Sequence, residues 1–256
     1  MRLRVATRLL QIQRVLVRHG LDEIILATHL FRPLRFAFYL SPATWFERRK
    51  GGPRGERIRL ALEELGPIWV KFGQALSTRR DLLPLDIADE LEKLQDRVPP
   101  FPGLEAKAII EGAYGKPVGE VFAEFDETPL AAASIAQVHK AYLREPGGGL
   151  KPVAVKVLRP GIEQRFNKDL DSYFFAARMI ERFHPPSRRL RPQAVVETLA
   201  KSVAIEMDLR MEAAAISEMA ENSRADEGFR VPQVDWSRSA RRVLTLEWID
   251  GIPIAD

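Results

Sequence analysis

The sequence contains no cysteine and only four histidines among its 256 residues. The absence of cysteine excludes disulfides, thiolate nucleophiles, iron–sulfur clusters and cysteine-ligated zinc, and it suits a reducing compartment. No two histidines are four residues apart, which is the spacing that lets two imidazoles on one helix face share a metal. We therefore expect no metal site from the scattered histidines, which are His19, His29, His139 and His184.

Long apolar runs are absent as well. No stretch approaches the roughly 20 residues that a membrane-spanning helix requires. Arginines interrupt residues 1–18 too often for a signal peptide. Because 46% of the residues are hydrophobic, the chain can still bury a sizeable core. We expect a folded protein with no transmembrane span in this chain.

Positive charge is concentrated at the amino-terminal end. Residues 1–60 contain 13 Lys and Arg against 4 Asp and Glu, a net charge of +9, and the remainder carries −5. These arginines alternate with apolar residues, which is typical of a segment that lies on an anionic membrane surface or an acidic partner. A helical arm packed on its own domain is an equally weighted alternative. No recognition motif accompanies the charge, so we expect no nucleic-acid partner.

The hydrophobic periodicity predicts helices up to about residue 100. Gly66-Pro67 ends one helix and begins the next, because proline suits the first turn of a helix. In the second helix Trp69, Phe72 and Leu76 form one stripe that should pack, and Lys71, Gln74 and Thr78 form another that should be presented. A further helix after Pro84 should direct Ile87, Leu91 and Leu94 inward.

From about residue 118 the pattern becomes mixed. Residues 136–143 and 153–158 read as two strands of a hairpin, joined by a glycine-rich turn at 144–149. Helical patterns cover residues 162–183 and 192 to about 222, and two further short strands are predicted at 229–234 and 242–248. The expected fold class is α+β, with a basic amphipathic helical arm at 1–60, a helical extension at 61–117 and a mixed domain at 118–256.

Lys156 is the candidate functional residue with the clearest setting. It lies within the alternating apolar run 153–157, directly after the hairpin turn. This order is typical of the small lobe of a kinase, where a compact lysine cation reaches nucleotide phosphates and a glutamate from a nearby helix fixes it. Glu206 and Glu212 are the candidate partners. On the helix predicted from 192 to about 222, Asp208 and Glu212 are four residues apart and share a face, while Glu206 points about 120° away from Glu212. The alternative is a solvated polar face.

The loop before the hairpin is rich in alanine where a kinase ordinarily carries glycines. Each methyl group restricts φ and keeps backbone N–H groups farther from a phosphate, so we expect a stiffer loop that seats nucleotide differently. The loop consists of Leu130, Ala131, Ala132, Ala133, Ser134, Ile135, Ala136, Gln137 and Val138.

Taken together and in order, these features resemble the UbiB family, the atypical kinase-like proteins of ubiquinone biosynthesis that are also called AarF-domain kinases. Residues 65–82 read L-G-P-I-W-V-K-F-G-Q-A-L-S-T-R-R-D-L and contain a K-x-G-Q signature. The alanine-rich loop, the run 153–157 and an E-x-D motif at 206–208 complete the resemblance. It covers essentially the whole chain and corresponds to the amino-terminal half of the family's proteins.

The resemblance implies a kinase-like small lobe, an antiparallel sheet with helices, preceded by a family-specific helical extension and lacking the large lobe. It implies that Lys156 contacts the phosphates of ATP or ADP, with Glu212 as its ion-pair partner. Backbone groups near Glu247 and Ile249 would contact adenine at the hinge. The extension over the site would comprise Lys71, Gly73, Gln74, Glu206 and Asp208, with Glu206 as a partner for Lys71.

One departure from kinases limits this reading. No segment matches H-x-D-x-x-x-x-N and no D-F-G triplet occurs, so the sequence offers no catalytic residue and no Mg²⁺ ligand. The Mg²⁺ ligands are expected in the carboxyl-terminal half, and we expect the present chain alone to be catalytically inactive.

For the full-length protein we expect ATP hydrolysis or phosphorylation of a small molecule or lipid. The expected location is peripheral, on the cytoplasmic face of the bacterial inner membrane. The expected partners are nucleotide, an anionic membrane or a prenylated quinone precursor, and quinone-biosynthesis proteins. The alternative is a non-catalytic, membrane-associated adaptor of a quinone-biosynthesis complex. Hydroxylation of the quinone ring finds no support, because the sequence has no dinucleotide fingerprint, metal triad or haem-ligand arrangement.

Overall fold

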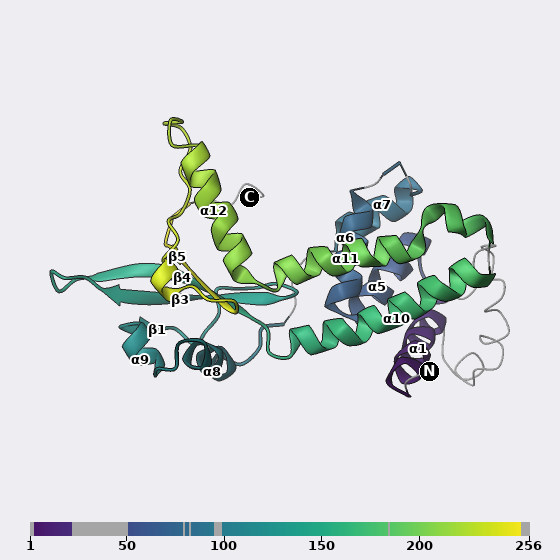
Figure 1. Cartoon of the computed structure of the whole chain (residues 1–256), viewed down its shortest axis with the longest axis horizontal. Helices are drawn as coiled ribbons and strands as arrows, with labels where there is room; N and C mark the ends of the chain where they lie inside the picture. Colours follow the sequence, from purple (N-terminus) through teal and green to yellow (C-terminus); the bar gives the residue numbers. More distant parts are fainter. Residues whose placement is uncertain are drawn as a thin grey trace. The chain divides into compact units, whose positions relative to one another are not determined.

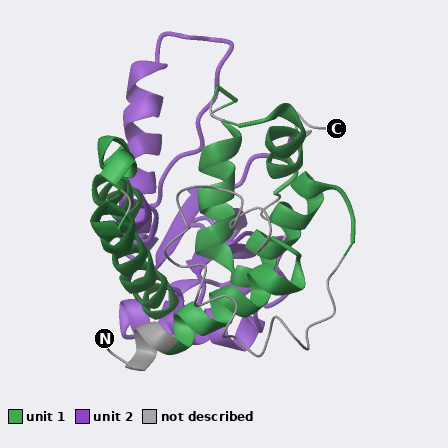
Figure 2. Ribbon diagram, turned by 90° about the vertical axis from the view of Figure 1, so that its right-hand side faces the viewer, with its two compact units in different colours: residues 1–95, 163–201 green, residues 96–162, 202–256 purple. Residues whose placement is uncertain are grey.

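The computed structural model describes residues 3–21, 51–78, 80–81, 83–94, 99–183 and 185–251 (Figure 1). The chain divides into two compact units (Figure 2). Unit 1 comprises residues 1–95 and 163–201, and unit 2 comprises 96–162 and 202–256. The domain boundaries expected at residues 60 and 117 stay predictions. Residues 22–50 of the basic arm expected at 1–60 lie outside the described residues, as does His184.

Unit 1 is helical throughout its described residues, as the periodicity predicted. The turn between the helix that ends at Leu65 and the helix that begins at Pro67 follows from two residues. Gly66 has a φ of 110°, which favours glycine, and Pro67 occupies the first helical position. The elements are α1 (Leu3–Arg18), α5 (Arg54–Leu65), α6 (Pro67–Ser77), α7 (Leu85–Glu92), α10 (Ile162–Phe183), the 3₁₀ helix η2 (Pro185–Leu190) and the part of α11 (Pro192–Glu206) up to residue 201.

The core of unit 1 lies between α5, α6 and α7. Ile87, Leu91 and Leu94 are buried there, which confirms the inward stripe predicted for the third of these helices. The packing stripe predicted for α6 is confirmed, since Leu76 packs on this core and the rings of Trp69 and Phe72 lie against Tyr173. Val70 is buried in the core, whereas Trp69 is half-buried and its ring lies 4.6 Å from that of Tyr173 on α10. The side of α6 around Trp69 is therefore covered by a helix about 100 residues away in sequence.

Helix α1 is packed within unit 1. Its apolar side chains Ile12 and Val15 are buried against Ala61 and Leu65 of α5. Arg8 donates through Nη2 to the carbonyl oxygen of Leu65 at 2.8 Å. For residues 3–18 the structure therefore favours the packed arm over an apolar face free to lie on a membrane. None of the helices in the described ranges is long and apolar enough to cross a membrane.

Unit 2 is built on an antiparallel sheet. The strand order is β1-β3-β4-β5, and β2 also pairs with β3. Lys156 on β4 lies opposite Val138 on β3 and Leu244 on β5. The elements are α8 (Gly103–Tyr114), α9 (Val118–Val121), β1 (Glu124–Phe125), β2 (Ala131–Ala132), β3 (Ala136–Arg144), β4 (Leu150–Leu158), the end of α11, α12 (Leu209–Asn222), η3 (Trp236–Arg238) and β5 (Val243–Glu247).

The two faces of this sheet are covered by different helices. Val153, Val155 and Val157 of β4 point to the face covered by α8 and α9, where they form a core with Ile110. Alternate residues point to the other face, where Leu158 packs with Leu209 and Ala213 of α12. In Figure 1, α8 and α12 lie on opposite sides of the strands. Lys156 belongs to the α12 face.

The predicted hairpin is confirmed, and its strands are longer than expected. The turn closes through Gly148, whose amide donates to the carbonyl oxygen of Glu145 at 3.0 Å and whose φ is 87°. Two other elements were predicted wrongly. The helix expected from 192 to about 222 is broken between α11 and α12, and residues 229–234 form no strand beyond an isolated bridge at Val234. Pro232 has no N–H to donate to a longer ladder.

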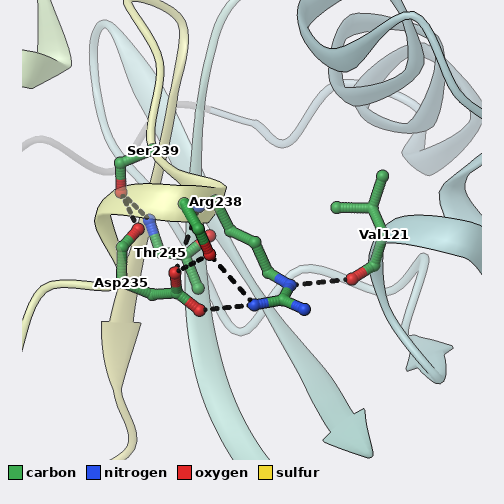
Figure 3. Close-up of polar contacts among 6 residues, drawn as sticks. Val121, Asp235, Arg238, Ser239 and Thr245 are labelled. Carbon is green, nitrogen blue, oxygen red and sulfur yellow. Dashed lines mark hydrogen bonds and ion pairs between the residues drawn. The ribbon is translucent and has the colours of Figure 1, made fainter.

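A polar cluster ties the chain before β5 to α9 (Figure 3). The Arg238 guanidinium donates to the Val121 carbonyl at 2.9 Å and to the Asp235 carboxylate at 2.9 Å. Ser239 Oγ donates to the Asp235 carbonyl and accepts from the Thr245 amide. Burial opposes ionisation of Asp235, but the hydrogen bonds from Ser237 and Arg238 outweigh it and lower the pKa of this carboxyl group. The cluster fixes the approach to β5 on unit 2.

Gln137 is the polar centre of the α8 face. Its side chain is 1% exposed, accepts from the Phe101 amide at 3.0 Å and donates to the Phe101 carbonyl at 3.1 Å. Its Nε2 also lies 2.9 Å from His139 Nε2. Since His139 Nδ1 lies 2.8 Å from the Asp126 carbonyl, Nδ1 carries the proton and Nε2 accepts. Burial lowers the pKa of His139, in keeping with this neutral form.

Replacing Gln137 by leucine should lower the free energy of unfolding by about 2 kcal/mol, because the buried Phe101 amide and carbonyl would lose their partners. Urea denaturation of the whole chain measures the change. The matched control is Gln233→Leu at an exposed position, which should change stability by less than about 0.5 kcal/mol. Equal stability of the two variants would contradict the role assigned to Gln137.

Candidate functional site

The ion pair between Lys156 and Glu212 is the centre of the candidate site. Lys156 Nζ donates to both carboxylate oxygens of Glu212, each at 2.8 Å. The side chains are 28% and 39% exposed, so the pair lies at the edge of the α12 face rather than in the core. A lysine held in this way remains accessible to a ligand while its position on the sheet is restricted. The bidentate geometry suits a cation presented to an anion such as a phosphate.

Glu212 reaches Lys156 because α12 begins just before it. Asp208 caps this helix, with its carboxylate accepting from the Arg210 amide at 3.1 Å. Asp208 therefore lies at a helix start rather than within a continuous helix, and the face argument based on a helix running through 206–212 is wrong. Hydrogen bonds from the Arg210 side chain lower the pKa of Asp208. Asp208 is occupied by capping and by Arg210, while Glu212 faces the sheet.

The alanine-rich loop is held tightly by backbone bonds. The Ala133 amide donates to the Ala136 carbonyl, and the Leu130 amide donates to the Val138 carbonyl, each at 2.8 Å. In the described part of the chain the one non-glycine residue with positive φ is Arg191, so every loop residue has a backbone that alanine adopts without strain. The loop conformation thus needs no glycine.

Arg159 was not predicted, yet it holds this loop. Its Nε donates to the Ala133 carbonyl at 2.9 Å, and its Nη2 donates to the Pro99 carbonyl at 2.9 Å. Its own amide donates to the Ile135 carbonyl at 2.8 Å. The sequence signal is weak, since an arginine just after a strand marks no motif. Its position one residue beyond β4 could only have been interpreted once the pairing of the hairpin was known.

Not all predicted loop side chains lie on the face of Lys156. Gln137 points to the α8 face, where its side chain bonds with the Phe101 backbone and lies beside His139; its part in nucleotide binding stays a prediction. Ala136 is buried in the core beneath α12 and Ser134 is 5% exposed. Val138 is half-buried beside Lys156, and Leu130 is exposed.

The predicted hinge follows the end of β5. Glu247 is the last paired residue of this strand, and Ile249 is 39% exposed. The Glu247 carboxylate accepts from Arg230 at 2.5 Å and from the Gln233 amide at 3.2 Å. Burial opposes ionisation of Glu247, but these bonds outweigh it and lower its pKa. The Glu247 side chain is thus committed to the segment before β5, and its amide donates to the Gln233 carbonyl at 2.8 Å, which leaves its carbonyl oxygen for a ligand.

The K-x-G-Q residues belong to α6 in unit 1. Gly73 allows a close approach there, because an added Cβ would come within 2.4 Å of Leu94 Cδ1 and 2.7 Å of Leu62 Cδ1, so both leucine side chains would have to shift. Gln74 donates to the Leu94 carbonyl at 3.0 Å. These two residues therefore hold α6 against its neighbouring helices. Glu206 ends α11 within unit 2, and its pairing with Lys71 stays a prediction.

The described residues offer little to a metal ion. Within these ranges no group of three or more Asp, Glu or His side chains is arranged to hold one. The Asp208 carboxylate is occupied by Arg210, and the Glu212 carboxylate by Lys156. The acids present therefore do not fit Mg²⁺. A hollow of about 560 Å³ lies elsewhere, between α8 and the residues Ala240, Arg241 and Arg242, and none of the predicted site residues lines it.

Comparison with known proteins shows the family of this chain. The family model of the ABC1 atypical kinase-like domain matches residues 93–256, which include the sheet, Lys156 and Glu212. The chain belongs to this family. It is 47% identical to the probable protein kinase UbiB of Marinobacter nauticus over 249 residues, covering 97% of this chain and 45% of that protein. It is 46% identical to the protein of the same name from Pseudomonas putida, covering 100% of this chain and 47% of that one.

A solved structure is also similar to this chain. The structure of the Mycobacterium tuberculosis protein Rv3197 in complex with erythromycin is similar to this chain, with a TM-score of 0.53 and 32% sequence identity. The similarity covers 76% of this chain and 48% of that one. This member of the ABC1/UbiB family therefore spans about half the length of the relatives it matches, and the α+β, kinase-like fold class expected from its sequence is confirmed.

Proposed function

We propose that this chain is the nucleotide-binding half of an atypical kinase-like enzyme. The observation that carries the proposal is the bidentate ion pair of Lys156 with Glu212 on an accessible face of the sheet. A lysine fixed by a glutamate is the arrangement that a kinase small lobe presents to the phosphates of ATP. The proposed adenine contacts are the backbone groups near Glu247 and Ile249, and the stiff loop at 130–138 would cover the phosphates through its backbone.

The proposed reaction of the full-length protein is ATP hydrolysis or phosphorylation of a small molecule or lipid in support of ubiquinone biosynthesis. The link to ubiquinone rests on the resemblance to the UbiB family and on the shared name of its relatives. Lys156 would bind and orient the phosphates, while Mg²⁺, when bound, would neutralise charge on the transferring group. In the proposed protein the Mg²⁺ ligands and the catalytic aspartate come from outside the present residues. Lys71, Gln74 and Glu206 are proposed to belong to an extension over the site.

Titration of the wild-type chain with ADP or ATP in a calorimeter tests this proposal. We expect saturable binding of one nucleotide per chain and no steady-state ATP hydrolysis, because the chain contains no H-x-D-x-x-x-x-N or D-F-G segment. Absence of saturable binding would overturn nucleotide binding by this half. ATP turnover that is abolished by Lys156→Ala would instead overturn the assignment of catalysis to residues outside the chain.

A membrane-associated adaptor stays the alternative for the full-length protein. The packing of α1 gives it no support, since the apolar residues Ile12 and Val15 are already buried against α5. No specific observation in unit 2 favours it over nucleotide binding. The proposed peripheral location at the inner membrane likewise rests on the resemblance and on the basic charge of residues 1–60.

A further inference from the structure

The place where β5 leaves the sheet is determined by Pro152. On β3 the carbonyl groups of Val138, Lys140 and Tyr142 accept bonds from the β1–β2 side, so the backbone groups of these residues point away from β4. Their partners on β4 are Lys156, Ala154 and Pro152, whose backbone groups therefore point to β5. Leu158, two residues beyond Lys156, has the same orientation: its amide donates to the Arg242 carbonyl at 3.0 Å, on the β5 side.

Lys156 and Ala154 of β4 thus direct their N–H groups toward β5, where they pair with Leu244 and Leu246. The next residue in this series is Pro152, which has no N–H. A proline there cannot close another pair, and the ladder ends at Val153 and Glu247. Trp248, the following residue, is therefore released from the sheet.

Released from the ladder, Trp248 is held by its side chain instead. Lys140 Nζ lies 4.4 Å from the centroid of the Trp248 ring and 5.6 Å from that of Tyr142. The indole Nε1 donates to the Asp250 carboxylate at 2.7 Å. Lys140 shares its face of the sheet with Lys156, one cross-strand row away, because Val138 and Lys140 alternate along β3. A second lysine of this face is thus directed at the hinge rather than at Glu212.

We infer that Lys140 and Pro152 are positioning residues that fix Trp248, so that the backbone of residues 247–249 is held ready for an adenine ring. Pro152 prevents Trp248 from joining the sheet, and the Lys140 ammonium group fixes the indole ring of Trp248 through the cation–π contact. The inference rests on the proposed function, since it assigns the base-recognising edge of the same site. It separates two tasks: Lys156 with Glu212 serves the phosphates, and Lys140 with Trp248 serves the base.

The test compares a ligand that has a base with one that has none. ADP and inorganic tripolyphosphate are titrated into the wild-type chain and the Lys140→Met, Lys140→Arg and Pro152→Ala variants. Lys140→Met should weaken ADP binding roughly three- to tenfold, the range expected for losing one cation–π contact. Pro152→Ala, which supplies an N–H that could pair with Trp248, should weaken ADP binding to a similar extent. Tripolyphosphate binding should change less than about twofold in every variant, and Lys140→Arg, which keeps the cation over the ring, should bind ADP within about twofold of wild type.

The control is Lys116→Met, which removes the same charge at an exposed position after α8 and should bind ADP like the wild type. Unchanged ADP affinity in Lys140→Met would overturn the inference and leave the proposed function intact. An equal loss for ADP and tripolyphosphate would also overturn it, because Lys140 would then act as a phosphate-binding cation. No saturable ADP binding by the wild-type chain would overturn the proposed function itself. Thermal unfolding of each variant verifies that it is folded.

Discussion

Nucleotide affinity should fall about thirtyfold in Lys156→Met and about tenfold in Glu212→Gln, and the double variant should be no weaker than Lys156→Met alone. The two effects are not additive because Glu212 acts on the nucleotide only by fixing Lys156, to which both its oxygens bind at 2.8 Å. Charged hydrogen bonds of this kind are worth about 1.5–3 kcal/mol, which sets the expected range. Isothermal titration with ADP on the four proteins measures the cycle.

The matched control for Glu212→Gln is Glu218→Gln, an exposed acid on the same helix α12. It removes one negative charge from the same helix and should leave the ADP affinity within about twofold of the wild-type value, because exposed charges are screened by solvent and salt. Additive losses in the double variant would show that Glu212 meets the nucleotide directly. Such a result would contradict the role of Glu212 as a partner of Lys156.

Replacing Arg8 by methionine should lower the free energy of unfolding at pH 7 by about 3 kcal/mol, the largest stability change expected in this chain. Arg8 pairs with Asp169 of α10, donates to the Leu65 carbonyl at 2.8 Å and donates to Gln11 Oε1 at 2.9 Å. The side chains of Arg8 and Asp169 are only 16% and 9% exposed. Without the guanidinium, the Asp169 carboxylate would be buried without its cation.

The loss should also depend on pH. Burial raises the pKa of Asp169 even though Arg8 opposes this, and removing Arg8 should raise that pKa further. A carboxyl group whose pKa is raised by folding favours the folded state at low pH, and this contribution is lost as pH rises through the folded pKa. The difference in unfolding free energy between wild type and Arg8→Met should therefore be largest at pH 7. It should become smaller toward pH 4, near the unfolded pKa of aspartate.

Urea denaturation at pH 7 and at pH 4.5 measures both effects. Arg54→Met is the control, since Arg54 pairs with Asp86 at 2.9 Å but both side chains are about half exposed. That variant should lose less than about 1 kcal/mol, with little dependence on pH in this range. A loss in Arg8→Met no larger than in Arg54→Met would mean that the Arg8 pair contributes no more than a surface ion pair.

The sequence predicted those parts of the fold that local residues determine. Gly66 and Pro67 mark a helix junction because each restricts its own backbone, and the hairpin at 136–158 follows from alternation around a glycine turn. The break before α12 was missed because apolar spacing continues across it. Asp208, which caps α12, is the signal that could have located it.

The site was predictable in its types of residue and less so in its geometry. A lysine on a strand and a glutamate on a later helix can be read from the sequence, but the orientation of Gln137 depends on strand register, and one residue more or less reverses it. Arg159 and Arg8 act through contacts with distant segments, Pro99 and Asp169 among them. No periodicity encodes such contacts, so only the folded structure reveals them.

The discontinuity of unit 1 has a consequence for folding. Lys156 and Glu212 are 56 residues apart, and most of the chain between them, residues 163–201, belongs to unit 1. Forming the ion pair therefore closes a long loop, and the entropy lost on closure is smaller when α10 and α11 are already ordered. During folding, α12 should therefore pack on the sheet late, after the intervening helices have formed. Because residues 163–201 connect the two partners of the ion pair, the folding of unit 1 controls how readily the candidate site forms in unit 2.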